Sequence, residues 1–596
     1  MTESALSMAL SALGYRHAWC IDFEFVAPPG HKPKPICMVA TCAITNEVIR
    51  LWGDQLARYP FDVTPDNLFI AFYASAETSC FDVLGWPHPS RMLDLFTEFR
   101  CLTNGVGSNH GNSLIGAQLF YGLPTIGGEE KNAMRDLIMS GGPWTDLQIA
   151  QIIAYCESDV VALRGLLGAM LPSLTRRPGR FGQALLRGRY MAAAGVVENN
   201  GVPTDLALWP CLVEHWASIE RGLIETVDAD YCVYNDGKFV AAKFAAFLSA
   251  NNIPWPRLPS GALALDDDTF RTQARGYPVI SPLRELRYTL GQLRLNKLSV
   301  GTDGRNRTIL SAFQAKTGRN QPSNSKFIFG PSVWVRHLIK PAEGRAIAYI
   351  DWSSQEIAVA GALSGDNALW EAYASGDPYI AFAKQAGLAP PDATKKSHSD
   401  IRNACKAIVL GVNYGMGPES IAAQSGIHID SARQLLRLHR DTYRVFWRWA
   451  EENVDRVLLG MPLETVFGWR IHFPPGCNAD VNARSILNWP MQSHGAEMMR
   501  LGLSMAVEAG FMICAPIHDA LLLEAPIEEI EEQARAVAEI MAQASEIVLG
   551  PGKRCRSDIK IIRYPDRFED EARGSVMFSR VMDLLHAAEK GGGAGV

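Results

Sequence analysis

Short apolar runs that end in acidic residues recur along the chain and form its clearest structural pattern. The run at residues 18–21 is followed by Asp22-Phe23-Glu24-Phe25, and the run at residues 346–350 is followed by Asp351. A short apolar run bounded by polar residues is typical of a buried β-strand. Two apolar runs within residues 511–525 flank His518-Asp519 and predict a hairpin whose turn carries the acid.

Helical periodicity dominates several longer stretches, at residues 148–171, 206–227, 283–298 and 367–453. Residues 41–52 are rich in strand formers, and residues 172–182 are rich in Pro, Arg and Gly, which predicts a domain boundary there. The stretch at 283–298 carries four basic residues, compatible either with phosphate contacts or with an ordinary solvated helix face.

Composition restricts the class of protein. The 596 residues exceed a single domain, and 47% hydrophobic with 20% charged residues excludes a mostly disordered or fibrous chain. The absence of an apolar run of about eighteen residues predicts a cytoplasmic protein without membrane contact. The twelve cysteines include no C-x-x-C pair, which argues against a zinc ribbon or a dense disulfide scaffold. His88, His398 and His439 lack partners at ligand spacing, so we expect these histidines to be polar surface residues rather than metal ligands.

The net charge of −6 argues only weakly against nucleic-acid binding, because carboxylates committed to metal sites can mask a basic groove.

Asp351 and Asp519 are strand-end acids from distant segments, as a two-metal phosphoryl-transfer site requires. Between them, four residues recur every four positions and predict one helix stripe: Arg402, Lys406, Leu410 and Tyr414. A stripe of Arg, Lys and an aromatic residue can bind a triphosphate and stack on a base, whereas an isolated R-x-x-x-K would indicate only an amphipathic surface helix.

These segments resemble motifs A, B and C of the family A DNA polymerases, the bacterial polymerase I class, over about residues 185–570. The matching residues are Asp351, Ser353 and Glu356 in D-x-S-x-x-E; Arg402, Lys406, Tyr414 and Gly415 in the second motif; His518 and Asp519 in H-D-E; Thr317-Gly318-Arg319 upstream; and Arg484, Asn488 and Gln492 downstream.

The resemblance implies a role for each matching residue. Asp351 and Asp519 would hold two Mg²⁺ ions, for which Mn²⁺ can substitute. Arg402 and Lys406 would bind the phosphates of the incoming dNTP, and Glu356 would exclude a ribose 2′-hydroxyl. The other implied contacts are Tyr414 near the templating base, and Arg319, Arg484, Asn488, Gln492 and His518 on the primer–template DNA.

Two positions depart from the family pattern. Leu410 replaces an aromatic residue, so stacking on the incoming nucleotide must be looser or supplied elsewhere. Ala520 replaces the last acid of the H-D-E motif, the least essential of the three acids, and we expect activity to survive both changes.

The N-terminal block resembles the proofreading 3′–5′ exonucleases of the DEDDy type. Asp22 and Glu24 match D-x-E, with both carboxylates on one strand face, and Tyr155 and Asp159 match Y-x-x-x-D, one helical turn apart. The resemblance implies two Mg²⁺ ions held by these acids and a water oriented by Tyr155. The remaining acid is assigned to Glu77, within Tyr73-Ala-Ser-Ala-Glu77, with Asp82 and Asp94 as alternatives.

We therefore expect an α/β multidomain protein: an RNase H-like 3′–5′ exonuclease domain at 1–180, then a right-hand polymerase at 181–596. Its thumb would span about 205–310, its palm about 311–365 and 471–596, and its fingers about 366–470. The short N-terminal block leaves no room for a 5′-nuclease domain, which favours a monomeric, phage-type replicative polymerase in the host cytoplasm. Replisome partners are not indicated.

Four alternatives remain open. They are a polymerase with weak exonuclease activity, a single-subunit RNA polymerase, a DNA-binding scaffold with decayed sites, and a stand-alone ribonuclease. Glu356 argues against the RNA polymerase, and intact Asp351, Lys406 and Asp519 argue against the scaffold. The ribonuclease leaves the C-terminal motifs unexplained.

Overall fold

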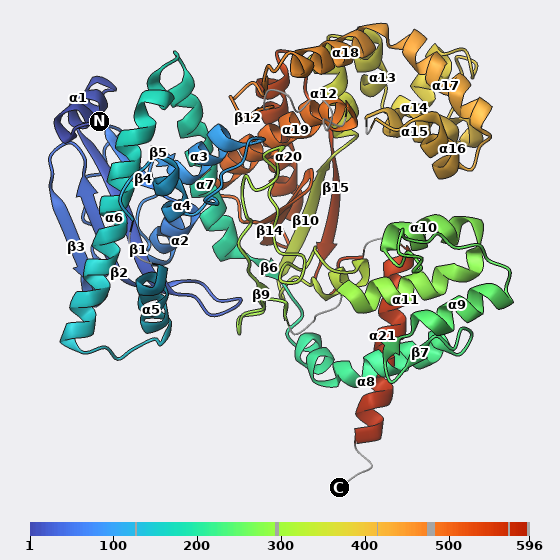
Figure 1. Ribbon diagram of the computed structural model, residues 1–596, viewed down its shortest axis with the longest axis horizontal. Coiled ribbons are helices and arrows are strands. Elements are labelled where there is room, and N and C mark those ends of the chain that lie inside the picture. Colours follow the sequence, from blue (N-terminus) through green and yellow to red (C-terminus); the bar gives the residue numbers. More distant parts are fainter. Residues whose placement is uncertain (126–127, 293–296, 414, 474–482, 570–571, 593–596) are drawn as a thin grey trace.

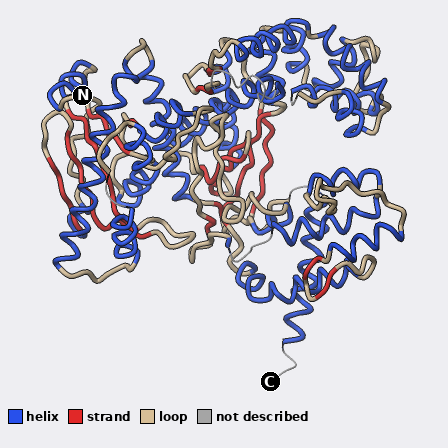
Figure 2. Tube along the Cα trace, viewed as in Figure 1, coloured by secondary structure: helices blue, strands red, loops and turns tan. Residues whose placement is uncertain are grey.

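The computed structural model describes the chain from residue 1 to 592, except for residues 126–127, 293–296, 414, 474–482 and 570–571. Two β-sheets organise it (Figures 1 and 2). The N-terminal sheet lies at one side of the molecule and the second sheet near its middle. Helices α13–α18 lie beyond one end of the second sheet, and helices α8–α11 lie beyond the other.

The N-terminal sheet has the strand order β3-β2-β1-β4-β5. Strands β1, β2 and β3 pair antiparallel, whereas β4 and β5 continue the sheet in parallel. The strands are β1 (His17–Val26), β2 (Lys34–Cys42), β3 (Val48–Trp52), β4 (Asn67–Ala71) and β5 (Met92–Asp94). The helices of this unit are α1 (Glu3–Ala12), α2 (Ser75–Leu84), α3 (Leu95–Thr103), α4 (Leu114–Phe120), α5 (Gly128–Met139) and α6 (Asp146–Thr175).

Helix α7 (Arg180–Asn200) joins the two sheets. Its glycines 188 and 195 lie seven residues apart and so share one helix face. A Cβ on Gly188 would lie 2.0 Å from the Met92 carbonyl oxygen of β5, and one on Gly195 would lie 2.3 Å from Thr78 Oγ1 of α2. Glycine at both positions therefore allows the helix to pack closely against the N-terminal unit, beyond the boundary expected near residue 180.

The second sheet has the order β13-β14-β10-β15 and is antiparallel throughout. Its strands are β10 (Arg345–Trp352), β13 (Ile513–Ile517), β14 (Ala520–Pro526) and β15 (Ser557–Arg563). The strand expected at residues 346–351 and the hairpin expected at 511–525 are both confirmed. Helices α12 (Gln355–Ser364), α19 (Ala483–Glu508) and α20 (Ile530–Leu549) pack around this sheet.

The remaining helices form two groups. One group contains α8 (Leu208–Asp228), α9 (Ala241–Ala250), α10 (Asp267–Gly276) and α11 (Ser281–Gln292). The C-terminal helix α21 (Ala572–Gly592) packs against α8 of this group and against the 3₁₀ helix η4 (Val333–Leu338). The other group contains α13 (Asn367–Ala374), α14 (Pro378–Gln385), α15 (Ser399–Asn413), α16 (Pro418–Ser425), α17 (Ile429–Thr442) and α18 (Arg444–Leu458).

One histidine departs from the expectation of a polar surface residue. His439 of α17 is 2% exposed, and its Nδ1 accepts a hydrogen bond from Trp447 Nε1 at 3.1 Å. Burial lowers its pKa to about 3, so the ring is neutral and packs as a core residue. None of the described helices combines the length and the apolar character that crossing a membrane requires.

A buried ion pair connects three segments of the junction between the sheets. Arg187 of α7 donates two hydrogen bonds to Glu98 of α3, at 2.6 and 2.8 Å, and a third to the Phe467 carbonyl at 2.8 Å. Both charged side chains are at most 2% exposed. Removing one partner of such a pair destabilises the folded state, because the other charge is then left buried without compensation.

We expect Glu98→Ala to lower the free energy of unfolding by about 3–5 kcal/mol, since it leaves the Arg187 guanidinium buried and unpaired. Glu508→Ala is the matched control, because it breaks the solvent-accessible Arg189–Glu508 pair and should cost less than about 1 kcal/mol. Urea denaturation followed by tryptophan fluorescence measures both. Equal effects of the two variants would contradict the assignment of the buried pair as a stabilising junction.

Candidate functional site

Asp351 lies near the end of β10, the strand that pairs with β14 on one side and β15 on the other. It is directly opposite Ala520 of β14 and Asp558 of β15. The next residue, Trp352, donates its backbone N–H to the Asp519 carbonyl at 3.2 Å. Strand pairing therefore brings together two acids that are 168 positions apart in the chain.

Burial and like charge both act on Asp351. Burial is the larger cause and the charge of Asp519 the next; together with the charge of Asp558, they raise the pKa of Asp351 to about 8. Asp351 Oδ1 is buried and has no hydrogen-bond partner among the described residues. A buried carboxylate oxygen without a donor, close to other carboxylates, fits a divalent cation, which prefers oxygen ligands.

Helix α15 presents the stripe expected from the sequence. Arg402 Nε donates to Asp377 Oδ2, and the Arg402 guanidinium lies 5.2 Å from the ring centroid of Tyr379. Lys406 Nζ lies 5.9 Å from the same ring. Lys406 and Leu410 also line an open hollow of about 450 Å³. Tyr414 lies outside the described residues.

Tyr379 of α14 is a site residue that the sequence motifs do not indicate. Burial raises the pKa of its phenol, and the neighbouring Ser354 and the charge of Arg402 lower it by smaller amounts. Tyr379 thus connects the segment after Asp351 with the basic stripe of α15. Glu356 lies in the first turn of α12, one turn beyond β10.

The residues expected to contact DNA lie in two places, around a hollow and on helix α19. Arg319 and His518 line a hollow of about 400 Å³. His518 has a φ of +53°, so the turn before β14 adopts a left-handed backbone. Asn488 and Gln492 lie one turn apart on α19, and the buried Asn488 Oδ1 has no hydrogen-bond partner among the described residues. The Arg484 side chain lies outside the described part of the chain.

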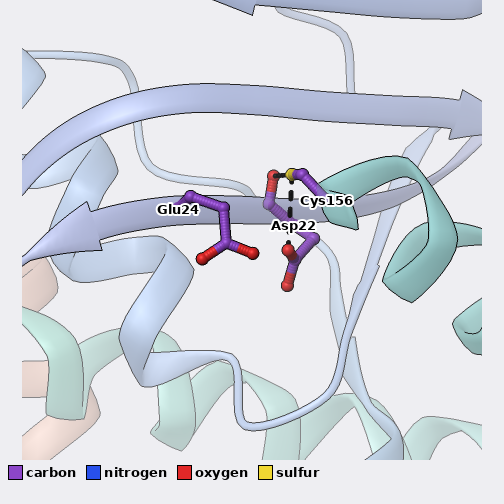
Figure 3. A group of neighbouring side chains, drawn as sticks. All are labelled: Asp22, Glu24 and Cys156. Atoms are coloured by element: carbon purple, nitrogen blue, oxygen red, sulfur yellow. Dashed lines mark hydrogen bonds between the residues drawn. The ribbon is translucent and has the colours of Figure 1, made fainter. Parts of the chain in front are cut away.

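The N-terminal sheet carries a second carboxylate cluster. Asp22 and Glu24 alternate on β1, and both side chains point to the same side of the strand (Figure 3). Cys156 Sγ of α6 lies 3.4 Å from both the Asp22 carbonyl oxygen and Asp22 Oδ2. The ligand atoms of these three residues lie within 4.8 Å of one another, close enough to share one ion.

The acids of the cluster raise one another's pKa values, because their negative charges repel. Burial and then the charge of Asp159 raise the pKa of Asp22 to about 7, and burial and then the charge of Asp22 raise that of Glu24 to about 10. Lys131 Nζ lies 3.3 Å from Asp159 Oδ2. Burial and then the charge of Asp159 raise the pKa of the Tyr155 phenol, which places the phenol beside that acid. The helix thus brings Tyr155 and Asp159 to the strand acids, as the sequence spacing predicts.

Glu77 also belongs to this cluster. It is 5% exposed, and its pKa is raised first by burial and then by the charge of Asp22. Its Oε2 atom has no hydrogen-bond partner among the described residues. The two alternatives have other partners: Asp82 accepts from Asn199, and Asp94 caps α3 by accepting from Thr97 N–H. The geometry therefore favours Glu77 as the acid next to Asp22.

Metal-free protein should lose stability as the pH rises, because the folded state holds a proton on Asp351 up to a pH of about 8, far above the usual 3.8. The unfolded state releases that proton near pH 4, so the loss runs from about pH 4 through pH 8. With EDTA present, we expect Asp351→Asn to raise the melting temperature at pH 8.5 and to change it little at pH 5. An equal change of the melting temperature at both pH values would contradict the raised pKa of Asp351.

Comparison with known proteins identifies the C-terminal part. Residues 293–554 match the sequence model of DNA polymerase family A. A thermostable DNA polymerase I of Thermus thermophilus is 28% identical over 221 residues, which cover 35% of this chain and 26% of that protein. A DNA polymerase of Mycobacterium phage D29 is 27% identical over 246 residues, 41% of this chain and 39% of the phage protein. The matches thus span well under half of either relative.

The fold has a solved counterpart that extends over nearly the whole chain. The POL domain of Pol1 from M. smegmatis, solved in complex with DNA primer-template and dNTP, superposes with a TM-score of 0.70 at 18% identity. The superposition covers 94% of this chain and 98% of that one. The family match includes Asp351, the α15 stripe and Asp519. Residues 293–554 are therefore similar to the DNA polymerases of family A, and the fold of the chain is similar to that of a Pol1 polymerase domain.

Proposed function

We propose that this protein is a template-directed DNA polymerase that adds dNMPs to a primer 3′-hydroxyl. The observation that carries the proposal is the juxtaposition of Asp351 and Asp519 at the centre of the palm sheet. The family match over residues 293–554 supports it, and so does the similarity to a domain solved with primer-template and dNTP. The proposed substrates are accordingly primer–template DNA and dNTPs.

Asp351 and Asp519 would hold two Mg²⁺ ions, and the partnerless Asp351 Oδ1 fits this role. When bound, the ions supply activation of the primer hydroxyl and stabilisation of the leaving pyrophosphate. Lys406 and Arg402 would bind the triphosphate and place positive charge where negative charge develops. Because Asp377 already holds the Arg402 guanidinium in place, that side chain is oriented before the nucleotide arrives.

The remaining palm and finger residues would select the correct nucleotide. Glu356 would exclude a ribose 2′-hydroxyl. Tyr414 would lie near the templating base, and Leu410 would contact the incoming nucleotide without aromatic stacking. The proposed DNA contacts of the minor groove and primer end are Arg319, Arg484, Asn488, Gln492 and His518. Glu356 separates this proposal from the alternative of a single-subunit RNA polymerase.

We further propose that the N-terminal unit, residues 1–180, is a 3′–5′ exonuclease of RNase H-like fold that proofreads. The buried cluster of Asp22, Glu24, Glu77 and Asp159 supports the proposal, since concentrated carboxylates fit two Mg²⁺ ions. Tyr155, whose phenol lies beside Asp159, would orient the attacking water. Weak exonuclease activity remains the alternative, because Glu77 is one methylene longer than an aspartate. The phage D29 relative supports a role in phage genome replication.

The two activities should be separable by mutation. We expect Asp519→Ala to lower the primer-extension rate at least about a hundredfold and to leave 3′-end trimming unchanged, because it removes a carboxylate only from the palm. Asp22→Ala should do the reverse. A labelled primer–template, incubated with and without dNTPs, measures both rates.

Asp54→Ala, an exposed acid of the N-terminal unit, is the control and should retain both activities. Trimming that persists in Asp22→Ala would refute the exonuclease assignment, and loss of both activities in Asp519→Ala would show that the sites are not independent.

Glu356 should determine sugar selectivity. We expect Glu356→Ala to raise the ratio of rNMP to dNMP incorporation about 10- to 100-fold, because it removes the steric exclusion of the 2′-hydroxyl. Single-nucleotide incorporation with each substrate measures the ratio. Glu371→Ala, an exposed acid on nearby α13, is the matched control. An unchanged ratio in Glu356→Ala would show that another residue excludes ribonucleotides.

A further inference from the structure

Three neighbouring strands of the palm place one row of side chains across the sheet at the level of Asp351. Asp351 of β10 is directly opposite Ala520 of β14 and directly opposite Asp558 of β15. Side chains of directly opposed residues project from the same face, with Cβ atoms about 4.5–5.5 Å apart. The row Ala520–Asp351–Asp558 therefore lies on one face, and Asp519 is covalently next to its first member.

The row contains two acids, Asp351 and Asp558, and Asp558 lies on the side of Asp351 opposite to the one where the family pattern has its acid. The H-D-E pattern of the family has an acid at the position of Ala520, on the β14 side of Asp351. Here that position is a buried methyl group, 0% exposed. The position on the β15 side, at the same level of the sheet and one strand from Asp351, is the carboxylate of Asp558. The row thus keeps a second acid beside Asp351, on the opposite neighbouring strand.

Contacts of Asp558 fix its carboxylate beside the site. Ser353 Oγ, two residues after Asp351, donates to Asp558 Oδ2 at 2.6 Å. The Ser353 backbone N–H donates to the Arg556 carbonyl at 2.9 Å, which holds the segment after β10 against the residue before β15. Asp558 is exposed, so its carboxylate is accessible to a hydrated cation. A carboxylate that accepts one hydrogen bond still has lone pairs for a cation.

We propose that Asp558 is the third carboxylate ligand of the palm cation site and replaces the acid that Ala520 lacks. This assignment rests on the proposed function, in which Asp351 and Asp519 hold divalent cations. With Asp558 the site carries three formal negative charges against two divalent cations. Affinity for hard cations rises with the number of charged oxygen ligands, so the departure at Ala520 need not weaken cation binding.

The test measures Mn²⁺ binding directly, by electron paramagnetic resonance of free Mn²⁺. The full-length chain carries Asp22→Ala and Glu24→Ala, so that binding reports the palm rather than the N-terminal cluster. In this background, Asp558→Asn should raise the Kd for Mn²⁺ about tenfold. The amide retains an oxygen that accepts from Ser353 but loses the charge, so a purely structural role would leave the Kd unchanged. Asp566→Ala, an exposed acid after the same strand, is the control.

Primer extension as a function of Mg²⁺ concentration gives the second measurement. Asp558→Asn should raise the Mg²⁺ concentration for half-maximal rate by a similar factor, and Ala520→Glu added to Asp558→Asn should lower it again. A Kd equal to that of the Asp566→Ala control would overturn the assignment. If the background chain did not extend primers while Asp558→Asn still weakened Mn²⁺ binding, the proposed polymerase function would fail and the ligand assignment would stand.

Discussion

The central position of β10 in the second sheet is the constraint on which the candidate polymerase site depends. Continuous antiparallel pairing on both sides of this strand holds Asp351 opposite Ala520, the neighbour of Asp519, on one side and opposite Asp558 on the other. Carboxylates so close repel one another, and burial adds to the cost, as the pKa of Asp351 near 8 shows. The strand ladders and the core around the buried Trp352 offset that cost and keep the acids in position.

The N-terminal cluster follows the same physical design with deeper burial. A strand supplies Asp22 and Glu24, and two helices, α2 and α6, supply Glu77 and Asp159. The glycine face of α7 and the Arg187–Glu98 pair connect this unit to the second sheet. Buried residues from both units, Trp19 and Ile350 among them, belong to one hydrophobic core. The two candidate sites therefore stand on a shared packed scaffold.

The contacts between α14 and α15 give the site a connection between its acidic and basic parts. Tyr379 lies beside both Arg402 and Lys406 and close to Ser354, three residues after Asp351. Cation–π contacts of this kind orient charged side chains without neutralising them, so the basic groups keep their charge for phosphate.

Local pattern in the sequence determined much of this protein. The strands that carry Asp22 and Asp351, the hairpin of Asp519 and the helix stripe of Arg402 and Lys406 all follow from short apolar runs and helical spacing, because these signals are local. Only the tertiary structure decided which remote groups meet. Asp558 comes beside Asp351 through strand pairing, Tyr379 reaches α15 through helix packing, and Glu77 rather than Asp82 or Asp94 reaches Asp22. Strand register and helix contacts depend on the whole core, and a single sequence carries no direct record of them.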